Sequence, residues 1–78
     1  INEAFAVVAL TAIKELKLNS KCVNINGGAV SMGHPIGASG ARIMCTLLNA
    51  LIHNDKKLGV SSICIGGGEA LSMLVERI

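Results

Sequence analysis

The sequence predicts an α/β fold in which helices pack on a sheet, with elements in the order α-β-α-β-β. Two long runs place apolar residues at helical spacing, and three shorter runs have the length and alternation of strands. Turn residues, above all glycine, separate these runs. No repeat or low-complexity segment interrupts the pattern, so a single structural unit is expected.

The two predicted helices cover residues 2–17 and 38–53. The first has one apolar stripe, formed by Phe5, Val8, Ala9, Ala12, Ile13 and Leu16. Asn2 is a candidate N-cap for this helix. The second helix has only a narrow polar stripe, formed by Arg42, Thr46, Asn49 and His53. A helix with so little polar surface is expected to be mostly buried, with His53 in solvent.

The three predicted strands cover residues 22–26, 60–65 and 70–75. The first alternates apolar and polar residues, whereas the second is apolar enough to be buried. The turn Gly66-Gly67-Gly68 brings the third strand back beside the second. Residues 27–37 are expected to form a long loop between the first strand and the second helix.

The chain is too apolar for a small domain that stands alone. Of its 78 residues 51% are hydrophobic and 15% are charged. A chain of this size buries only about 60% of the surface that it exposes when unfolded. Since the first residue is Ile1 rather than methionine, we expect a piece of a larger protein that covers the remaining apolar surface.

Composition excludes several classes of function. A net charge of +2 with a single aromatic residue gives no footprint for nucleic acid. No apolar run reaches the roughly 18 residues of a membrane span. No pair of cysteine or histidine residues has metal-ligand spacing, so no metal site is expected. Three widely spaced cysteines favour a reducing compartment, the cytoplasm or alternatively the mitochondrial matrix.

His34 is the first candidate for chemistry. It lies in the stretch 24–40, which holds five of the nine glycines and the only proline. Glycine permits close backbone approach, and the predicted helix from residue 38 points its N-terminus at the loop. Such a place can stabilise a developing negative charge and orient an imidazole as a base or donor. The alternative is a structural or surface histidine. A phosphate-binding loop is excluded, because His34-Pro35 stands where Lys-Ser/Thr is required.

Cys64 is the second candidate. A lone cysteine is by default a buried structural residue, which is the interpretation kept for Cys22 and Cys45. Cys64, however, ends a predicted strand just before three glycines whose N–H groups could bind an anion. A thiol in that place could become a thiolate that moves protons or attacks a carbonyl. The glycines lack the spacing of a dinucleotide fingerprint.

Three blocks of the sequence resemble the C-terminal signature blocks of the thiolases, in the order and spacing of the biosynthetic acetoacetyl-CoA thiolases. They are Asn2-Glu3-Ala4-Phe5-Ala6, the stretch 24–40 with Gly33-His34-Pro35, and Cys64-Ile65-Gly66-Gly67-Gly68. The resemblance covers essentially the whole chain. It implies that residues 1–78 are a thiolase-like C-terminal half domain, part of a five-layer αβαβα fold. Glu69, Ala70 and Ser72 depart from the usual Gln, Gly and Ala, which bears on the subfamily.

The resemblance also implies catalytic roles. Thiolases join or split acyl chains on coenzyme A by a ping-pong Claisen reaction that uses a nucleophilic cysteine. By similarity His34 activates that cysteine and helps to hold a thioester oxygen, while Asn2 fixes the water that completes this oxyanion hole. Cys64 exchanges the α-proton of the incoming acetyl-CoA, and the N–H of Gly66 belongs to a second oxyanion hole. Ala4, Phe5 and Ile36 line the acyl and pantetheine pocket.

The implied function is condensation of two acetyl-CoA to acetoacetyl-CoA, and the reverse thiolysis. The alternatives are a degradative 3-ketoacyl-CoA thiolase for longer chains and an inactive thiolase-like fragment or interaction module. No cofactor is expected, since the coenzyme A thioester is the substrate. The implied partners are a missing N-terminal domain with the nucleophile and further copies in a dimer or tetramer. Without that nucleophile the isolated chain is expected to be inactive.

Overall fold

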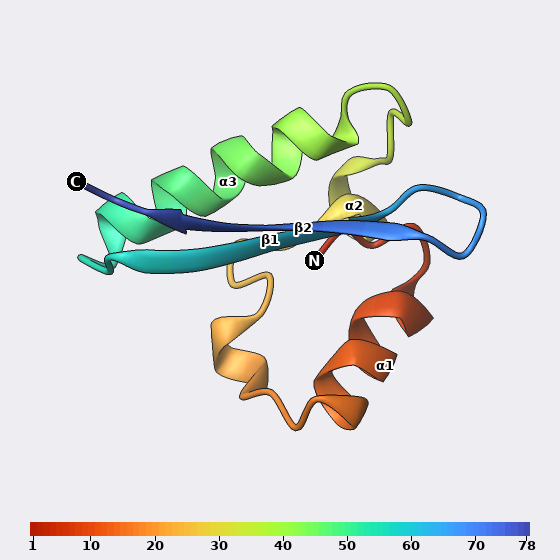
Figure 1. The fold of residues 1–78 in the computed structure, drawn as a ribbon, viewed down its shortest axis with the longest axis horizontal. Coiled ribbons are helices and arrows are strands. Elements are labelled where there is room, and N and C mark those ends of the chain that lie inside the picture. Colours follow the sequence, from red (N-terminus) through yellow and green to blue (C-terminus); the bar gives the residue numbers. More distant parts are fainter.

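The computed structural model describes residues 1–78 and combines helices with one two-stranded sheet (Figure 1). The elements in chain order are α1 (Ala6–Glu15), the 3₁₀ turn η1 (Ser20–Cys22), α2 (Ala29–Met32), α3 (Ser39–His53), β1 (Leu58–Cys64) and β2 (Ala70–Glu76). The predicted mixture of helices and strands is confirmed. No helix has both the length and the apolar content needed to cross a membrane.

β1 and β2 form an antiparallel hairpin, as predicted. Their register runs from the pair Leu58–Glu76 to the pair Cys64–Ala70 at the turn. The N–H of Ile65 donates to the carbonyl of Glu69 at 3.0 Å and closes that turn. Gly66 and Gly68 have φ values of 99° and 95°, which glycine adopts without the steric cost that other residues incur. The turn therefore depends on its glycines.

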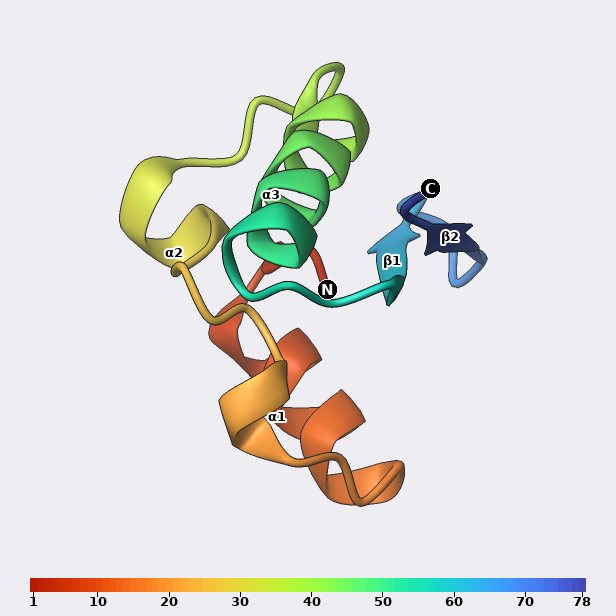
Figure 2. The same cartoon turned by 90° about the vertical axis from the view of Figure 1, so that its left-hand side faces the viewer.

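α3 packs against one face of the hairpin (Figures 1 and 2). Gly59 permits the close approach, because a Cβ atom there would lie 2.7 Å from Leu47 Cδ1 and 3.2 Å from Leu51 Cδ1. The buried side chains Ile43 and Leu51 come from this side of the helix. Sheet residues alternate between faces, so Ser61 and Ile63 share the covered face with Gly59.

The opposite side of α3 is open. Its exposed residues include Leu48 and Ile52, and His53 is exposed as predicted. Within this chain a two-stranded hairpin covers only one face of the helix, so burial of most of the helix stays a prediction for a larger protein. Part of the expected polar stripe instead turns inward, since Arg42 and Thr46 are half-buried and Arg42 donates to Thr46 Oγ1 at 3.3 Å.

The N-terminal helix is shorter than predicted. Residues 1–5 precede it, and Phe5 at its N-cap position has extended backbone angles. Asn2 is not the cap, because its backbone N–H donates to the carbonyl of Ser62 in β1 at 2.9 Å. That bond ties the start of the chain to the hairpin, so the helix begins only at Ala6.

The predicted strand over residues 22–26 is absent. The 3₁₀ turn η1 reaches Cys22, and the only ladder contact nearby is an isolated bridge between Ile25 and Gly27. Asn24 has a φ of 47°, which breaks an extended run. Its side chain is used instead to bind Ile1 and Glu3. A second difference is α2, a single helical turn inside the segment predicted as loop.

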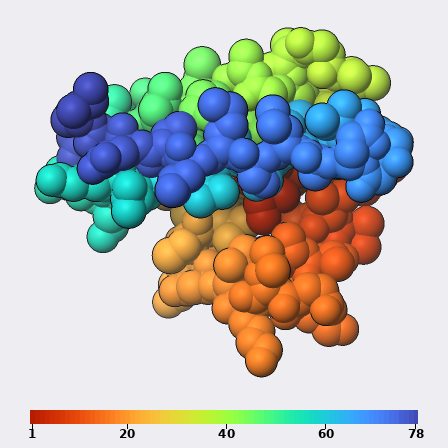
Figure 3. Space-filling model, in the orientation of Figure 1, coloured from red at the N-terminus to blue at the C-terminus, as the bar shows by residue number.

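Figure 3 shows the resulting shape, with the hairpin and α3 above and the red-to-orange N-terminal lobe below. Only 8 of the 78 residues are buried, and the buried hydrophobic ones are Ala9, Ala29, Ile43 and Leu51. Many large apolar side chains are exposed, as the composition predicts. The chain by itself has a small core.

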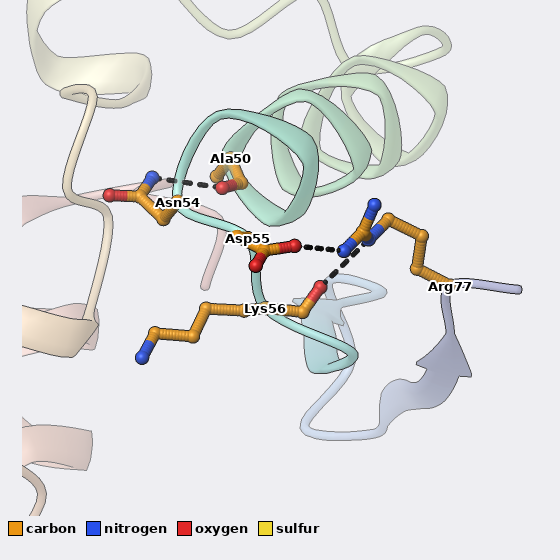
Figure 4. A network of polar contacts seen from close by, with 5 residues as sticks. All are labelled: Ala50, Asn54, Asp55, Lys56 and Arg77. Carbon is orange, nitrogen blue, oxygen red and sulfur yellow. Dashed lines mark hydrogen bonds and ion pairs between the residues drawn. The ribbon is translucent and has the colours of Figure 1, made fainter.

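The end of β2 is fastened to the turn between α3 and β1 (Figure 4). Arg77 forms an ion pair with Asp55 at 2.6 Å, and its Nε donates to the carbonyl of Lys56 at 3.0 Å. In the same turn, the Asn54 side chain donates to the carbonyl of Ala50 at 2.8 Å and caps the end of α3. These contacts are at the surface and fix the far end of the hairpin.

Candidate functional site

Asn2 joins the hairpin to the glycine-rich loop. Its side chain is 1% exposed, and its backbone is held by Ser62 in β1. Its Nδ2 lies 3.5 Å from Nε2 of His34, while its Oδ1 is buried without a hydrogen-bond partner. The structure thus places two predicted site residues, 32 positions apart in sequence, in direct contact.

His34 is contacted at both ring nitrogens. Opposite the Asn2 contact, its Nδ1 lies 2.5 Å from the hydroxyl oxygen of Ser39, the first residue of α3. The ring is half-buried, so it is fixed on two sides but still reachable from outside the chain. Gly33, with a φ of 99°, makes the turn that presents the histidine. This geometry suits a general base or a hydrogen-bond donor.

Glu3 secures the loop from the N-terminal side. Its carboxylate accepts from the N–H of Val30 at 3.1 Å and from the Asn24 side chain at 3.0 Å. Gly28 leaves room for that carboxylate, because a Cβ there would lie 2.5 Å from Glu3 Cδ. The amino group of Ile1 also binds Asn24, and burial lowers the pKa of that amino group.

Cys64 ends β1 next to the glycine turn, as predicted, and it is a free, exposed thiol. It lies two residues beyond Ser62, to which Asn2 is bonded, and so roughly 7 Å farther along the same strand. By alternation it shares with Ser62 the face of the sheet that α3 does not cover. Gly66 follows two residues later with its backbone in the left-handed region.

The other cysteines do not match the default interpretation. Cys22 and Cys45 are both exposed, as is Cys64, so none of the three is a buried structural residue in this chain. Cys45 lies on α3 and Cys22 in η1, both outside the loops that carry His34 and Gly66. The structure contains no group of three or more His, Cys, Asp or Glu side chains placed to hold a metal ion.

The predicted pocket residues do not enclose a cavity within this chain. Phe5 and Ile36 are 74% and 85% exposed, and Ala4 is half-buried. Two hollows of about 290 and 300 Å³ lie elsewhere, one beside α1 and the other between α3 and the hairpin. Neither is lined by His34, Cys64 or Asn2.

Two contributing residues were not identified from the sequence. Glu3 contacts residues that are distant in sequence, and Ser39 contacts residues on the other side of a turn. A serine or glutamate at the start of a helix ordinarily bonds only to the first turn of that helix, so neither residue stood out in the sequence. The only sequence signal for Ser39 is its position four residues after Pro35, at the start of a predicted helix. For Glu3 the signal is its place beside Asn2.

Comparisons of this chain with known proteins all indicate the same family. Residues 1–77 match the family described as "Thiolase, C-terminal domain". The chain is 54% identical over 77 residues to an acetyl-CoA acetyltransferase of Escherichia coli and 55% identical over 78 residues to one of Schizosaccharomyces pombe. It is 50% identical over 80 residues to a 3-ketoacyl-CoA thiolase of Psychrobacter arcticus.

A solved structure has the same fold. The crystal structure of the Bacillus anthracis acetyl-CoA acetyltransferase matches with a TM-score of 0.94 and 43% sequence identity over 99% of this chain. The chain spans 20% of the length of that protein, and 20% of the E. coli and S. pombe relatives. The predicted fold, a thiolase-like C-terminal half domain, is therefore confirmed.

Proposed function

Because the chain belongs to the thiolase family, as its C-terminal domain, we propose that the protein carrying it is an acetyl-CoA C-acetyltransferase. It condenses two acetyl-CoA to acetoacetyl-CoA and catalyses the reverse thiolysis. This chain provides the acid–base part of the site, and an N-terminal half provides the nucleophilic cysteine. The observation that carries the proposal is the contact between Asn2 and His34, which come from separate signature blocks.

In the proposed first half-reaction His34 takes the proton of the nucleophilic thiol. The thiolate attacks the thioester carbonyl, and an acyl-cysteine forms as the bond to the coenzyme A sulfur breaks. Cys64 gives its proton to the departing coenzyme A thiolate and becomes a thiolate, while His34 keeps the proton that it took. A base with an accessible nitrogen is required for this step, and the half-buried ring of His34, fixed on both sides, meets the requirement.

In the second half-reaction Cys64 removes the α-proton of acetyl-CoA. The resulting enolate oxygen carries negative charge, which His34 and a water held by Asn2 stabilise. The carbanion then attacks the acyl-cysteine, and the N–H of Gly66 binds the tetrahedral oxyanion. When this intermediate collapses, the bond to the nucleophilic sulfur breaks, acetoacetyl-CoA leaves, and the released thiolate takes back the proton from His34. The exposed thiol of Cys64 and the buried, unpartnered Oδ1 of Asn2 support these roles.

The remaining assignments follow the same proposal. Ala4, Phe5 and Ile36 contact the acyl and pantetheine groups, and the exposure of Phe5 and Ile36 in this chain leaves these two free to do so. The coenzyme A thioester is substrate, and no cofactor takes part. The protein assembles as a dimer or tetramer in the cytoplasm, with the mitochondrial matrix as the alternative.

A degradative 3-ketoacyl-CoA thiolase is the second candidate, favoured by the 50% identity to a relative of that name. Thiolysis rates of the full-length protein on acetoacetyl-CoA and on a longer 3-ketoacyl-CoA separate the two. The proposal predicts faster turnover of acetoacetyl-CoA. Equal or faster turnover of the longer substrate would favour the degradative enzyme.

The role of Cys64 is tested by Cys64→Ala in the full-length protein. Losing a positioned acid–base group should reduce thiolysis by about 10²- to 10⁴-fold. Cys45→Ala is the matched control, because Cys45 is also an exposed free thiol but lies on α3. Unchanged thiolysis in Cys64→Ala would leave the inactive, thiolase-like interpretation as the better one.

A further inference from the structure

We infer that Ser39 is a positioning residue that holds His34 in the tautomer protonated at Nδ1. This keeps Nε2 unprotonated and ready to accept a proton. The inference rests on the proposed function for its purpose, because that function needs a base at His34. Its geometric basis is independent of that function and comes from three contacts that link Asn2, His34, Ser39 and Pro35.

The Ser39 hydroxyl lies between two groups. Its Oγ is 3.1 Å from the carbonyl oxygen of Pro35 and 2.5 Å from Nδ1 of His34, and the residue is 0% exposed. Since a carbonyl has no hydrogen to give, the hydroxyl is the donor in the contact with Pro35. A hydroxyl has one hydrogen, so in the other contact Oγ accepts, and Nδ1 of His34 carries the proton.

The opposite side of the ring fits the same assignment. Nε2 faces the amide nitrogen of Asn2 at 3.5 Å, and an amide nitrogen is a donor only. A neutral imidazole protonated at Nδ1 has its lone pair at Nε2, which can accept from Asn2. Each contact in the series from Asn2 through His34 to Ser39 and Pro35 thus pairs one hydrogen-bond donor with one acceptor.

Burial makes Ser39 effective as an orienting group. No water competes for a hydroxyl without exposed surface, and Ser39 is anchored as the first residue of α3. The Pro35 carbonyl also accepts from the N–H of Ala38 at 2.8 Å and of Ser39 at 2.9 Å. These backbone bonds fix the Ser39 oxygen relative to the ring five residues earlier.

The tautomer can be read directly by NMR. Full-length protein would be labelled with ¹⁵N in histidine only, and a His34→Asn sample would identify the His34 signals. In wild type we expect Nδ1 to give the signal of a protonated ring nitrogen and Nε2 that of an unprotonated one. The reverse pattern in wild type would overturn the inference, whatever the enzyme's activity.

Ser39→Ala and Ser31→Ala form a matched pair for the second measurement. Ser31 lies in the same region and donates to the Gly28 carbonyl at 2.8 Å, much as Ser39 donates to Pro35, but it does not contact His34. Ser39→Ala should populate the tautomer protonated at Nε2 and slow alkylation of the nucleophilic cysteine about tenfold, the effect of one hydrogen bond. Ser31→Ala should change neither.

The outcomes separate this inference from the proposed function. If Ser39→Ala keeps the Nδ1 proton, Ser39 does not set the tautomer, even if His34 is catalytic. If the tautomer changes in Ser39→Ala but His34→Asn alkylates at the wild-type rate, the catalytic role of His34 fails while the positioning role of Ser39 stands.

Discussion

At the scale of single residues, the candidate site depends on small groups placed where larger ones would not fit. The Glu3 carboxylate occupies the space where a side chain on Gly28 would be, and from there it binds the N–H of Val30 in α2. Glu3 also holds Asn24, which in turn donates to the carbonyl of Ile1 at 2.8 Å. The residues on either side of Asn2 are therefore fixed, and this fixes Asn2 against His34.

Gly28→Ala tests this clamp. The new Cβ would lie 2.5 Å from Glu3 Cδ, so the carboxylate must move and lose its charge-assisted bond to Val30. We expect a loss of about 1–2 kcal/mol in the free energy of unfolding, measured by urea titration. Gly37→Ala is the control, since nothing lies within 4 Å of its Cβ position. Equal stability of the two variants would argue against the clamp.

The sequence was informative about residues whose neighbours in the chain reveal their role. His34 was identified from its glycine-rich surroundings and Asn2 from the resemblance to the thiolase signature blocks, and the structure places them in contact. Ser39 was not identified, because its role depends on a hydroxyl contact that only the folded turn creates. Asn2 was also a candidate helix cap, and the bond to Ser62 in a strand 60 residues later could not be read from its surroundings.

At the scale of secondary-structure elements, the sequence pattern predicted helix or strand correctly wherever the element packs against another element of this chain. The hairpin and α3 were predicted within two residues at each end, because each buries one face against the other. The run 22–26 alternates like a strand but has no adjacent strand, and its polar Asn24 binds Ile1 and Glu3. Alternation of apolar and polar residues does not by itself produce a strand when no neighbouring strand is available for hydrogen bonding.

Gly59→Ala tests the contact between α3 and β1. An added methyl group would press on Leu47 and Leu51, and overpacking of this kind costs about 1–3 kcal/mol. Gly40→Ala, on α3 with open space at its Cβ, should be neutral or slightly stabilising. Urea titration of both proteins checks the difference, and an unaffected Gly59→Ala would mean that the helix adjusts without cost.

Arg77→Ala should matter much less, although its contacts are prominent in Figure 4. The Asp55 side chain is 93% exposed and that of Arg77 is 34% exposed, so water and salt screen their attraction. The backbone bond from the Arg77 N–H to the Lys57 carbonyl at 2.8 Å remains in the variant. We expect a loss below about 1 kcal/mol that shrinks further in high salt. A salt-independent loss well above that value would contradict this assignment.

At the scale of the whole molecule, the chain exposes far more apolar surface than a stable monomer of its size usually does. Exposed apolar residues lie on both strands, on the outer side of α3 and on α1, among them Leu10, Leu48, Ile52, Val60 and Leu74. The chain also spans only a fifth of its relatives' length. In our proposal the remainder of the protein and further copies cover these faces and complete the site.

The isolated chain should therefore behave differently from the full-length protein. We expect residues 1–78 alone to bind a hydrophobic dye strongly and to self-associate. We also expect no thiolysis, because the proposed nucleophilic cysteine lies outside these residues. Dye fluorescence and light scattering at equal molar concentrations check this, with the full-length protein as the reference. An isolated chain that remained monomeric without binding dye would show that its open faces need no cover.

If His34 is the base that activates the nucleophilic cysteine, as we propose, the alkylation rate of that cysteine must depend on His34. His34→Ala in the full-length protein should slow alkylation by an acyl analogue at least about 10²-fold. His53→Ala is the control, because His53 is exposed at the end of α3 and contacts none of the site residues. Alkylation of His34→Ala at the wild-type rate would contradict the account.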